Sequence, residues 1–385
     1  MTRLMSHRLP SLPQPGDAAA MLPTPTLVVD LDAMQRNLQR MADFARQHRL
    51  RLRPHAKMHK SAAIAKLQVA AGAVGVCVQK LSEAEALAAA GVTDLFISNE
   101  IVDLPKLARV AELAGRVTLA IAVDSKLGVE RLAQAMQAAG SHIDVFVEVD
   151  VGQGRCGVAP TAAGALAQQV VAHGPAGLRF AGLQAYHGRA QHLRSPAERE
   201  AAIHHAASLA RAAQASVTAA GIVCPLITGA GTGTFAFEAA SGLWGELQPG
   251  SYLFMDRDYA DNEPAPGAPV FEQALFIKAQ VISRGAAHAV IDAGHKAYAI
   301  DSGLPTTWLR SNLTLANGGD EHGILHPAPH VRADVLPQLG ETVWLVPGHC
   351  DPTVNLHDHL IAVRGGLQDG VVEAVWAVDA RGCVN

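Results

Sequence analysis

The sequence has 385 residues, of which 49% are hydrophobic and 17% charged, enough for one large barrel and a smaller domain. The formal net charge of -4 offers no basic face for nucleic acid and no charge block for an anionic membrane, so we expect neither partner. The five cysteines have no paired spacing, which argues against a disulfide framework. The sequence has no apolar run long enough for a membrane span or a signal peptide. Together these features predict a cytoplasmic protein.

In chain order, residues 1–24 are broken by prolines and polar residues, and we expect a loose arm or an edge strand there. Short apolar runs then alternate with alanine-rich helical stretches, and eight such runs occur between Leu50 and Asp256. Parallel strands need crossover helices, so this alternation predicts an α/β fold, a (β/α)8 TIM barrel over residues 25–262. A doubly wound open sheet is the alternative, but no glycine fingerprint follows the first strand.

A stretch rich in proline and turn residues, Asp261 to Val270, marks the end of the predicted barrel. Beyond it the helical period disappears, and apolar runs separated by glycine turns predict strands. We therefore expect a C-terminal all-β domain over residues 263–385.

Polar residues end the apolar runs of the predicted barrel, where catalytic groups of such barrels lie. Lys57 ends the first run, Gln79 the second, and Tyr186 and His187 the sixth. Desolvation in a barrel mouth would lower the pKa of Lys57 and make its amine a nucleophile towards an aldehyde. An ordinary surface lysine is the simpler alternative.

Two glycine-containing loops follow the seventh and eighth runs, "ITGAGTGTF" and "QPGSYLF", and they suit a phosphate group, although each alone is ordinary turn chemistry. Arg155 lies in a third glycine-punctuated loop, where it would stay charged beside a ring without donating its proton. An aldehyde-reactive lysine, a phosphate cradle and a charge-tuning arginine together imply pyridoxal phosphate.

A candidate metal pair lies in the predicted β domain. His349 and Asp351 are two residues apart, so in an extended strand they share a face while Cys350 points away. The carboxylate favours Mn²⁺ or Mg²⁺, with zinc as an alternative, and a hydrogen-bonded turn needs no metal at all. His357 and His359 repeat the spacing and compete as candidates.

With these residues identified, the chain resembles the fold-type III pyridoxal-phosphate enzymes of the D-threonine aldolase and D-serine dehydratase group. The similarity covers nearly the whole chain and is carried by "TPTLVVDLDAMQRN", "RPHAKMHKS", "DVGQGRCGV", "AYHGRAQH", "GAGTGTF", "GELQPGSYLFMD", "DEHG" and "VPGHCDPTVN". The resemblance implies that Lys57 holds the cofactor as an imine and that His349 and Asp351 bind the metal. It also implies a homodimer with sites near the interface, and cofactor contacts from Gln79, Arg155, Tyr186, Thr228, Gly231, Thr232, Gly250, Ser251 and Tyr252.

The resemblance further implies metal-dependent retro-aldol cleavage of D-threonine and related D-β-hydroxy-α-amino acids to glycine and an aldehyde. His192 is our first candidate for the base that takes the hydroxyl proton, and His187 the second. A D-serine or D-threo-3-hydroxyaspartate-type dehydratase is the alternative, although eukaryotic-type D-serine dehydratases carry histidine and cysteine at the two-apart positions, where this chain has His349 and Asp351. A racemase and a non-catalytic pyridoxal-phosphate-binding protein are less favoured.

Overall fold

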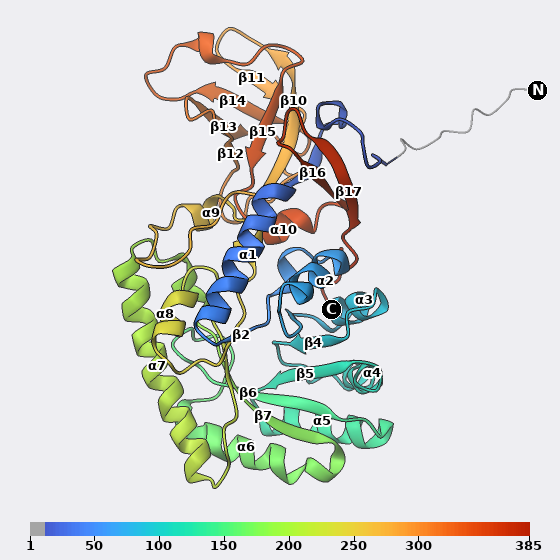
Figure 1. The fold of residues 1–385 in the computed structure, drawn as a ribbon, viewed down its shortest axis with the longest axis vertical. Coiled ribbons are helices and arrows are strands. Elements are labelled where there is room, and N and C mark those ends of the chain that lie inside the picture. Colours follow the sequence, from blue (N-terminus) through green and yellow to red (C-terminus); the bar gives the residue numbers. More distant parts are fainter. Residues whose placement is uncertain (1–11) are drawn as a thin grey trace, which may run out of the picture.

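The computed structural model describes residues 12–385 and arranges them around two β-sheets, one below the other in Figure 1. The first sheet has eight parallel strands in the order β2-β9-β8-β7-β6-β5-β4-β3, and a parallel bridge between His55 and Cys77 joins its two ends. The predicted fold class, a (β/α)8 barrel followed by a β region, is confirmed. The barrel strands are β2 (Arg51–Leu52), β3 (Val76–Val78), β4 (Asp94–Ile97), β5 (Thr118–Val123), β6 (Ile143–Glu148), β7 (Leu178–Ala185), β8 (Ile227–Gly229) and β9 (Glu246–Leu247).

Helices connect these strands and cover the outside of the barrel, as parallel strands require. The longest one, α7, begins with a capping box in which Ser195 and Glu198 satisfy each other's backbone N–H groups. The helices are α2 (Ala62–Ala70), α3 (Leu81–Ala89), α4 (Leu104–Ala114), α5 (Lys126–Ala139), α6 (Ala163–Ala172), α7 (Pro196–Ala219), α8 (Phe235–Ala240) and α9 (Arg257–Ala260).

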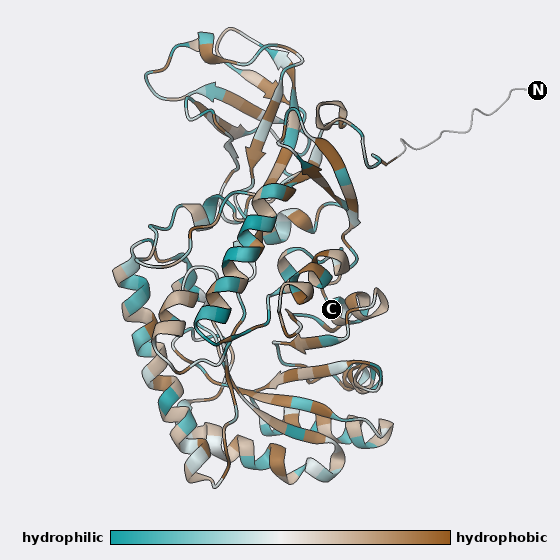
Figure 2. Cartoon of the chain, in the orientation of Figure 1, coloured by the Kyte–Doolittle hydropathy of each residue, from teal (hydrophilic) through white to brown (hydrophobic). Residues whose placement is uncertain are grey.

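Successive side chains of the barrel strands alternate between two apolar layers. In β4, Leu95 and Ile97 pack with the surrounding helices, whereas Phe96 faces the interior and lies 4.8 Å from the ring of Phe146. Because both faces are covered, the strands are apolar along most of their length, as the brown colour of β5 to β7 in Figure 2 shows.

Gly182 sits at a bulge in β7, where the pairing with β6 shifts by one residue. Its φ is +142°, and an added Cβ would lie 1.9 Å from the carbonyl oxygen of Leu226. We expect Gly182→Ala to lower the free energy of unfolding by about 3 kcal/mol or more, because backbone atoms must move. Gly174→Ala is the matched control, since nothing lies within 4 Å of its added Cβ. Equal urea midpoints for the two variants would contradict this assignment.

The second sheet has nine strands and mixes parallel with antiparallel pairing. The sequence placed strand Thr26–Asp30 in the barrel segment 25–262, but that strand, β1, pairs with β10 and β16 in the second sheet. Its backbone N–H and C=O groups pair with strands on both edges, and these two partners lie far along the chain, where the neighbouring sequence gives no sign of them. The other strands are β10 (Leu275–Arg284), β11 (Ala289–Ile291), β12 (Thr306–Thr307), β13 (Leu313–Asn317), β14 (Gly323–Pro327), β15 (Thr342–Val346), β16 (His359–Arg364) and β17 (Val371–Ala377).

The predicted N-terminal arm, 1–24, is described from residue 12 onward, and residues 1–11 lie outside the described part. Residues 16–19 pair with the edge of β17: Gly16 N–H donates to Val372 O at 2.8 Å, and Ala19 N–H donates to Gly370 O at 2.9 Å. None of the helices between residues 12 and 385 combines the length and the apolar character needed to cross a membrane.

Helix α1 (Leu31–Gln47) joins the two sheets through one shared apolar core, in which Met34 and Met41 pack with Leu253 and Leu345. Asn37, fully buried, donates hydrogen bonds to Leu253 O (3.1 Å) and Glu272 O (2.7 Å). This packing holds the short helix α10 (Cys350–Val354) of the second sheet against the 3₁₀ helix η2 (Ala56–Met58), which follows the first barrel strand. The two predicted sets of site residues are therefore brought together.

Candidate active site

A cavity of about 290 Å³ lies at the carboxyl ends of the barrel strands. Five residues that the sequence placed at the site line this cavity: Lys57, Gln79, Arg155, Tyr186 and His192. They come from η2, from the ends of β3 and β7 and from the loops that follow β6 and β7. The rule that barrel chemistry lies at strand ends thus locates the cavity correctly.

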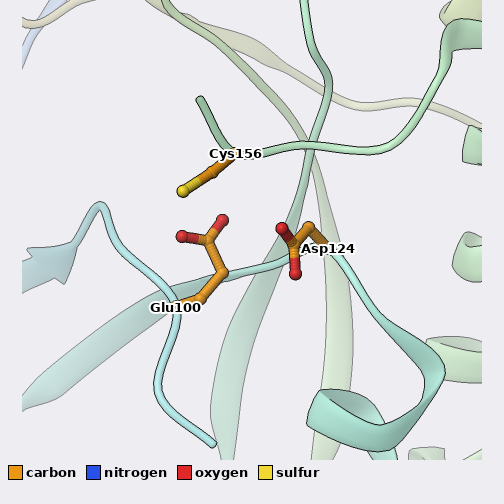
Figure 3. Close-up of side chains that lie close together, drawn as sticks. All are labelled: Glu100, Asp124 and Cys156. Carbon is orange, nitrogen blue, oxygen red and sulfur yellow. The ribbon is translucent and has the colours of Figure 1, made fainter. Parts of the chain in front are cut away.

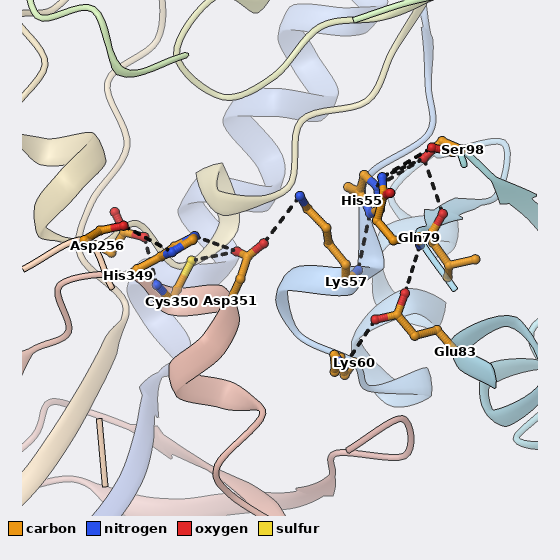
Figure 4. A network of polar contacts seen from close by, with 12 residues as sticks. His55, Lys57, Lys60, Gln79, Glu83, Ser98, Asp256, His349, Cys350 and Asp351 are labelled. Carbon is orange, nitrogen blue, oxygen red and sulfur yellow. Dashed lines mark hydrogen bonds and ion pairs between the residues drawn. The ribbon is translucent and has the colours of Figure 1, made fainter. Parts of the chain in front are cut away.

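Lys57 extends from η2 towards α10, and its Nζ lies 3.7 Å from Oδ2 of Asp351 (Figure 4). Burial is the largest influence and lowers the pKa of Lys57, but the charges of Asp351 first, and then of Tyr186 and Glu83, together outweigh it, and the net pKa lies above the ordinary value of 10.5. The sequence-based expectation of a lowered pKa is therefore wrong for the protein without a bound aldehyde or cation. The reason is a carboxylate from the second sheet, which the local sequence around Lys57 does not reveal.

Beside Lys57, His55 joins a polar network with Gln79 and Ser98 (Figure 4). Nε2 of His55 lies 3.0 Å from Nε2 of Gln79 and 3.2 Å from Oγ of Ser98. Burial first, and then the charge of Lys57, hold the pKa of His55 well below its usual range. A neutral His55 is therefore a hydrogen-bond partner and not a second cation in the cavity.

Arg155 and Tyr186 form the opposite wall of the cavity. The guanidinium carbon of Arg155 lies 5.9 Å from the Tyr186 ring centroid, within the range of a cation–π contact. Burial raises the pKa of the Tyr186 phenol against the opposing charges of Lys57 and Arg155, so its hydroxyl stays a hydrogen-bond donor at neutral pH.

The two predicted phosphate loops lie against each other, because the Tyr252 N–H donates to Oγ1 of Thr232 at 3.0 Å. Within residues 12–385, no protein acceptor contacts the backbone N–H groups of Gly231, Thr232, Gly250 and Ser251. A Cβ added at Gly250 would lie 3.0 Å from His55 O, so the loop closely approaches the segment that carries Lys57. Four backbone N–H groups without an acceptor in residues 12–385, on two adjacent loops, are available donors for a phosphate.

Two residues predicted around the phosphate have their side chains elsewhere. Tyr252 is fully buried in the shared core, and its hydroxyl accepts a hydrogen bond from Gln68 Nε2 at 3.3 Å. Thr228 is buried in the barrel interior, where Oγ1 donates to Glu246 at 2.9 Å and accepts from Gln248 at 2.7 Å. Only backbone atoms of Tyr252 belong to the loop pair, because a large apolar ring is more stable in the core than beside an anion.

His349 and Asp351 face each other, but not for the predicted reason. Strand β15 ends at Val346, His349 is the N-cap residue of α10, and Asp351 lies in its first turn, so the expected extended conformation is wrong. Pro347 and Gly348 end the strand, and a carboxylate is favoured at a helix N-terminus. Nε2 of His349 and Oδ1 of Asp351 are 3.7 Å apart, a separation that two ligands of one cation can adopt.

The orientation of His349 depends on a residue that the sequence did not identify. Nδ1 of His349 lies 2.8 Å from Oδ2 of Asp301, in the loop before β12. When the ring is neutral, a hydrogen bond from Nδ1–H to that carboxylate makes Nε2 the nitrogen that faces Asp351 and can bind a cation. Burial lowers the pKa of His349, but Asp351 and Asp301 raise it above the ordinary value, so a cation has to displace a proton at lower pH. Among the competing histidines, His357 contacts Ala297 O at 2.8 Å, and neither His357 nor His359 lines the cavity.

The two candidate bases differ in position. His192, at the end of η5 (Gly188–His192), lines the cavity, and its Nδ1 lies 2.8 Å from Oδ2 of Asp258. Its pKa is lowered by burial, against Asp258, and by the charge of His349. His187 does not line the cavity: its ring packs near Gly152 and His205 instead.

Two family models match the chain: "Alanine racemase, N-terminal domain" over residues 29–258, and "Putative serine dehydratase domain" over residues 274–363. The chain is 47% identical over 376 residues to a D-threonine aldolase of an Arthrobacter species, covering 97% of each protein. The crystal structure of a D-threonine aldolase from Filomicrobium marinum superposes with a TM-score of 0.93 at 48% identity, over 97% of this chain and 99% of that one.

A more distant match is the D-threo-3-hydroxyaspartate dehydratase from Delftia sp. HT23. Its structure has a TM-score of 0.82 at 28% identity and covers 94% of this chain and 98% of that one. A mutant of a D-threo-3-hydroxyaspartate dehydratase was also solved in a metal-free form. The resemblance inferred from the sequence motifs is confirmed. The chain therefore belongs to the alanine racemase-like family of fold-type III proteins, in its D-threonine aldolase group.

Proposed function

We propose that the chain cleaves D-threonine and related D-β-hydroxy-α-amino acids to glycine and an aldehyde, with pyridoxal phosphate and a divalent cation. The observation that carries this proposal is the approach of Lys57 and Asp351, 3.7 Å apart, which joins an amine suited to an aldehyde cofactor with a histidine–carboxylate pair. An aldol cleavage needs both functions on one substrate, at Cα and at the β-hydroxyl.

The chain's own residues fit the cofactor. We assign Lys57 as the amine that holds it, the free N–H groups of Gly231, Thr232, Gly250 and Ser251 as the phosphate contacts, and Arg155, Tyr186 and Gln79 as ring contacts. Pyridoxal phosphate, when bound, supplies an aldehyde for the amine and a ring that withdraws electrons from Cα. The side chains of Thr228 and Tyr252 do not contact the cofactor in this assignment; they stabilise the loops around it through packing and hydrogen bonds.

We assign His349 and Asp351 as ligands of Mn²⁺ or Mg²⁺, since a carboxylate and one imidazole suit these cations. Such a cation supplies positive charge that lowers the pKa of a bound hydroxyl. Neutralising Asp351 in this way also removes the largest of the interactions that raise the pKa of Lys57. The metal pair and the lysine are thus electrostatically coupled.

His192 is our assignment for the base that takes the proton of the β-hydroxyl, with Asp258 holding Nδ1 so that Nε2 is free. Burial keeps His192 neutral to a lower pH than an exposed histidine, which a base requires. His187, outside the cavity, is not retained for this role.

The pH profile tests the assignment of His192. We expect His192→Gln to lower kcat by about 10²–10⁴-fold, and the wild-type kcat/KM to fall only below the ordinary histidine pKa of 6.5. Asp258 raises the pKa of His192, so Asp258→Asn should move this acid limb to still lower pH. His204→Gln, on the exposed face of α7, is the control. An acid limb that stays in place in Asp258→Asn argues for another base.

The dehydratase alternative has less support. It would need the Cys350 thiolate as a metal ligand, but Cys350 is fully buried and its thiol donates a hydrogen bond to Oδ1 of Asp351 at 3.4 Å, so this side chain does not point away from the pair as the sequence predicted. Burial also raises the pKa of this thiol well above its usual range.

Product analysis tests the proposed activity. The purified holoenzyme is incubated with D-threonine and Mn²⁺, and the products are identified by chromatography. Glycine and acetaldehyde in equal amounts are expected. 2-Oxobutanoate and ammonia would indicate a dehydratase, an L- or allo-threonine product would indicate an epimerase, and no turnover with or without metal would exclude all three.

We also propose that the chain is a homodimer, as the family resemblance implies. In one chain, Asp320 of the "DEHG" segment pairs with His295 at 2.6 Å and does not line the cavity. In a dimer, this segment would instead lie near the active site of the partner subunit. Light scattering of the purified protein measures the mass, and a monomer would contradict this proposal.

A further inference from the structure

A second group of potential metal ligands lies at the ends of barrel strands β4, β5 and β6, away from His349 and Asp351. It consists of Glu100, Asp124 and Cys156, whose ligand atoms all lie within 4.8 Å of one another. Figure 3 shows the thiol of Cys156 and the two carboxylates pointing towards one another from three separate segments. We call these three residues the thiol–carboxylate cluster.

A fourth side chain, Glu148, adjoins the cluster, and within residues 12–385 no N–H or hydroxyl group donates a hydrogen bond to its carboxylate. It is the last residue of β6, and its side chain is only 6% exposed. Its nearest cation is Arg155, at 3.9 Å, and its other charged neighbours are the carboxyl groups of Glu100 and Asp124. Oε1 of Glu100 is likewise enclosed without a partner in the described part of the chain. Buried carboxylate oxygens without such donors need a proton or a cation.

We propose that the thiol–carboxylate cluster, with Glu148, is a second divalent cation site, specific for a borderline or soft cation such as Zn²⁺. A thiolate favours such cations over Mn²⁺ and Mg²⁺, which the imidazole–carboxylate pair of His349 and Asp351 suits better. Ligand atoms in filled sites are about 3–4 Å apart, so ligand atoms that lie within 4.8 Å of one another have to approach each other slightly as the cation binds.

Binding has to displace protons. Burial, and then the charge of Glu100, raise the pKa of the Cys156 thiol to about 11 and that of Glu148 to about 9. Without a cation Cys156 and Glu148 therefore keep their protons at neutral pH, and the cation replaces these protons as it binds. Affinity should consequently increase as the pH rises.

The cluster borders the cavity of Lys57 through Glu148 and Arg155. A cation bound to Glu148 neutralises the carboxylate that attracts Arg155, so the guanidinium, which already lines the cavity, can interact more strongly with an anionic or aromatic ligand there. The two cation sites would thus act on opposite walls of the same cavity, Asp351 on Lys57 and Glu148 on Arg155.

Metal content and X-ray absorption test this proposal on the holoenzyme loaded with Zn²⁺ and dialysed. Two Zn²⁺ per chain are expected, with a sulfur neighbour at about 2.3 Å. Cys156→Ser and Glu100→Gln should each reduce the content to one and remove the sulfur signal. Asp351→Asn should also reduce it to one but keep the signal. Cys224→Ser, a partly exposed thiol before β8, is the control and should change neither measurement.

Two results would overturn the second site. One is a content of a single Zn²⁺ that Asp351→Asn abolishes. The other is a sulfur signal that persists in Cys156→Ser, which would assign it to Cys350. Circular dichroism of each variant verifies that the fold is retained, and the thiol and amide replacements are nearly isosteric.

Discussion

Replacing Lys57 with alanine is expected to abolish both the visible absorbance of the bound cofactor and the aldolase activity, the latter by at least about 10³-fold. Lys57 is the lysine whose Nζ enters the cavity, 39% of its side chain is exposed there, and its ion pair with Asp351 is weak at 3.7 Å. Little stability should be lost with it. Absorbance titrations with pyridoxal phosphate and initial rates with D-threonine measure the two effects.

Lys60 is the matched control, three residues further along the same segment. Its Nζ lies 3.2 Å from Glu83 and 3.0 Å from Oδ1 of Asn355, and both partners of the ion pair are nearly buried. Lys60→Ala should keep the cofactor absorbance but lower the free energy of unfolding by about 3 kcal/mol, because the carboxylate of Glu83 loses its cation. If Lys57→Ala keeps the absorbance, or Lys60→Ala loses it in a folded protein, the lysine assignment is wrong.

The barrel can be predicted from the sequence because the pattern of each strand and helix lies within a short segment. Each of the eight apolar runs is followed by a helical stretch. The polar residue that ends a run lies at the mouth of the barrel, and this placement does not depend on which strands pair with it. This rule predicts Lys57, Gln79 and Tyr186, whereas Arg155 is predicted from its glycine-punctuated loop and His192 from the family resemblance. Strand β1 was misplaced because its two partners, β10 and β16, lie more than half the chain away.

What the sequence missed in the site are the partners that orient its side chains. Asp301 holds His349 from 48 residues away and Asp258 holds His192 from 66, and neither carboxylate belongs to a motif with its histidine. The raised pKa of Lys57 also depends on a residue that is distant in sequence, because Asp351 lies in α10, which follows β15 of the second sheet. Residue type and spacing locate candidates, whereas protonation depends on contacts that only the folded chain defines.

Replacing Asp351 with asparagine is expected to reduce Mn²⁺ affinity by at least about 100-fold. The variant should have almost no activity, and a chelator should not lower the small remaining activity further. Asp301→Asn should have a milder effect, about 10–100-fold in affinity, since it loosens His349 without removing a ligand. The wild-type enzyme should lose activity on dialysis against EDTA and regain it with Mn²⁺.

Asp369→Asn provides the control, because it removes the same negative charge from an exposed loop between β16 and β17. Isothermal titration of metal-free protein with Mn²⁺ measures the affinities directly, independently of catalysis. If Asp351→Asn binds Mn²⁺ as tightly as Asp369→Asn, the carboxylate facing Lys57 is not a ligand, and its ion pair with the lysine is its whole contribution. If only Asp351→Asn and Asp301→Asn lose Mn²⁺ affinity, the cation binds at His349 and Asp351.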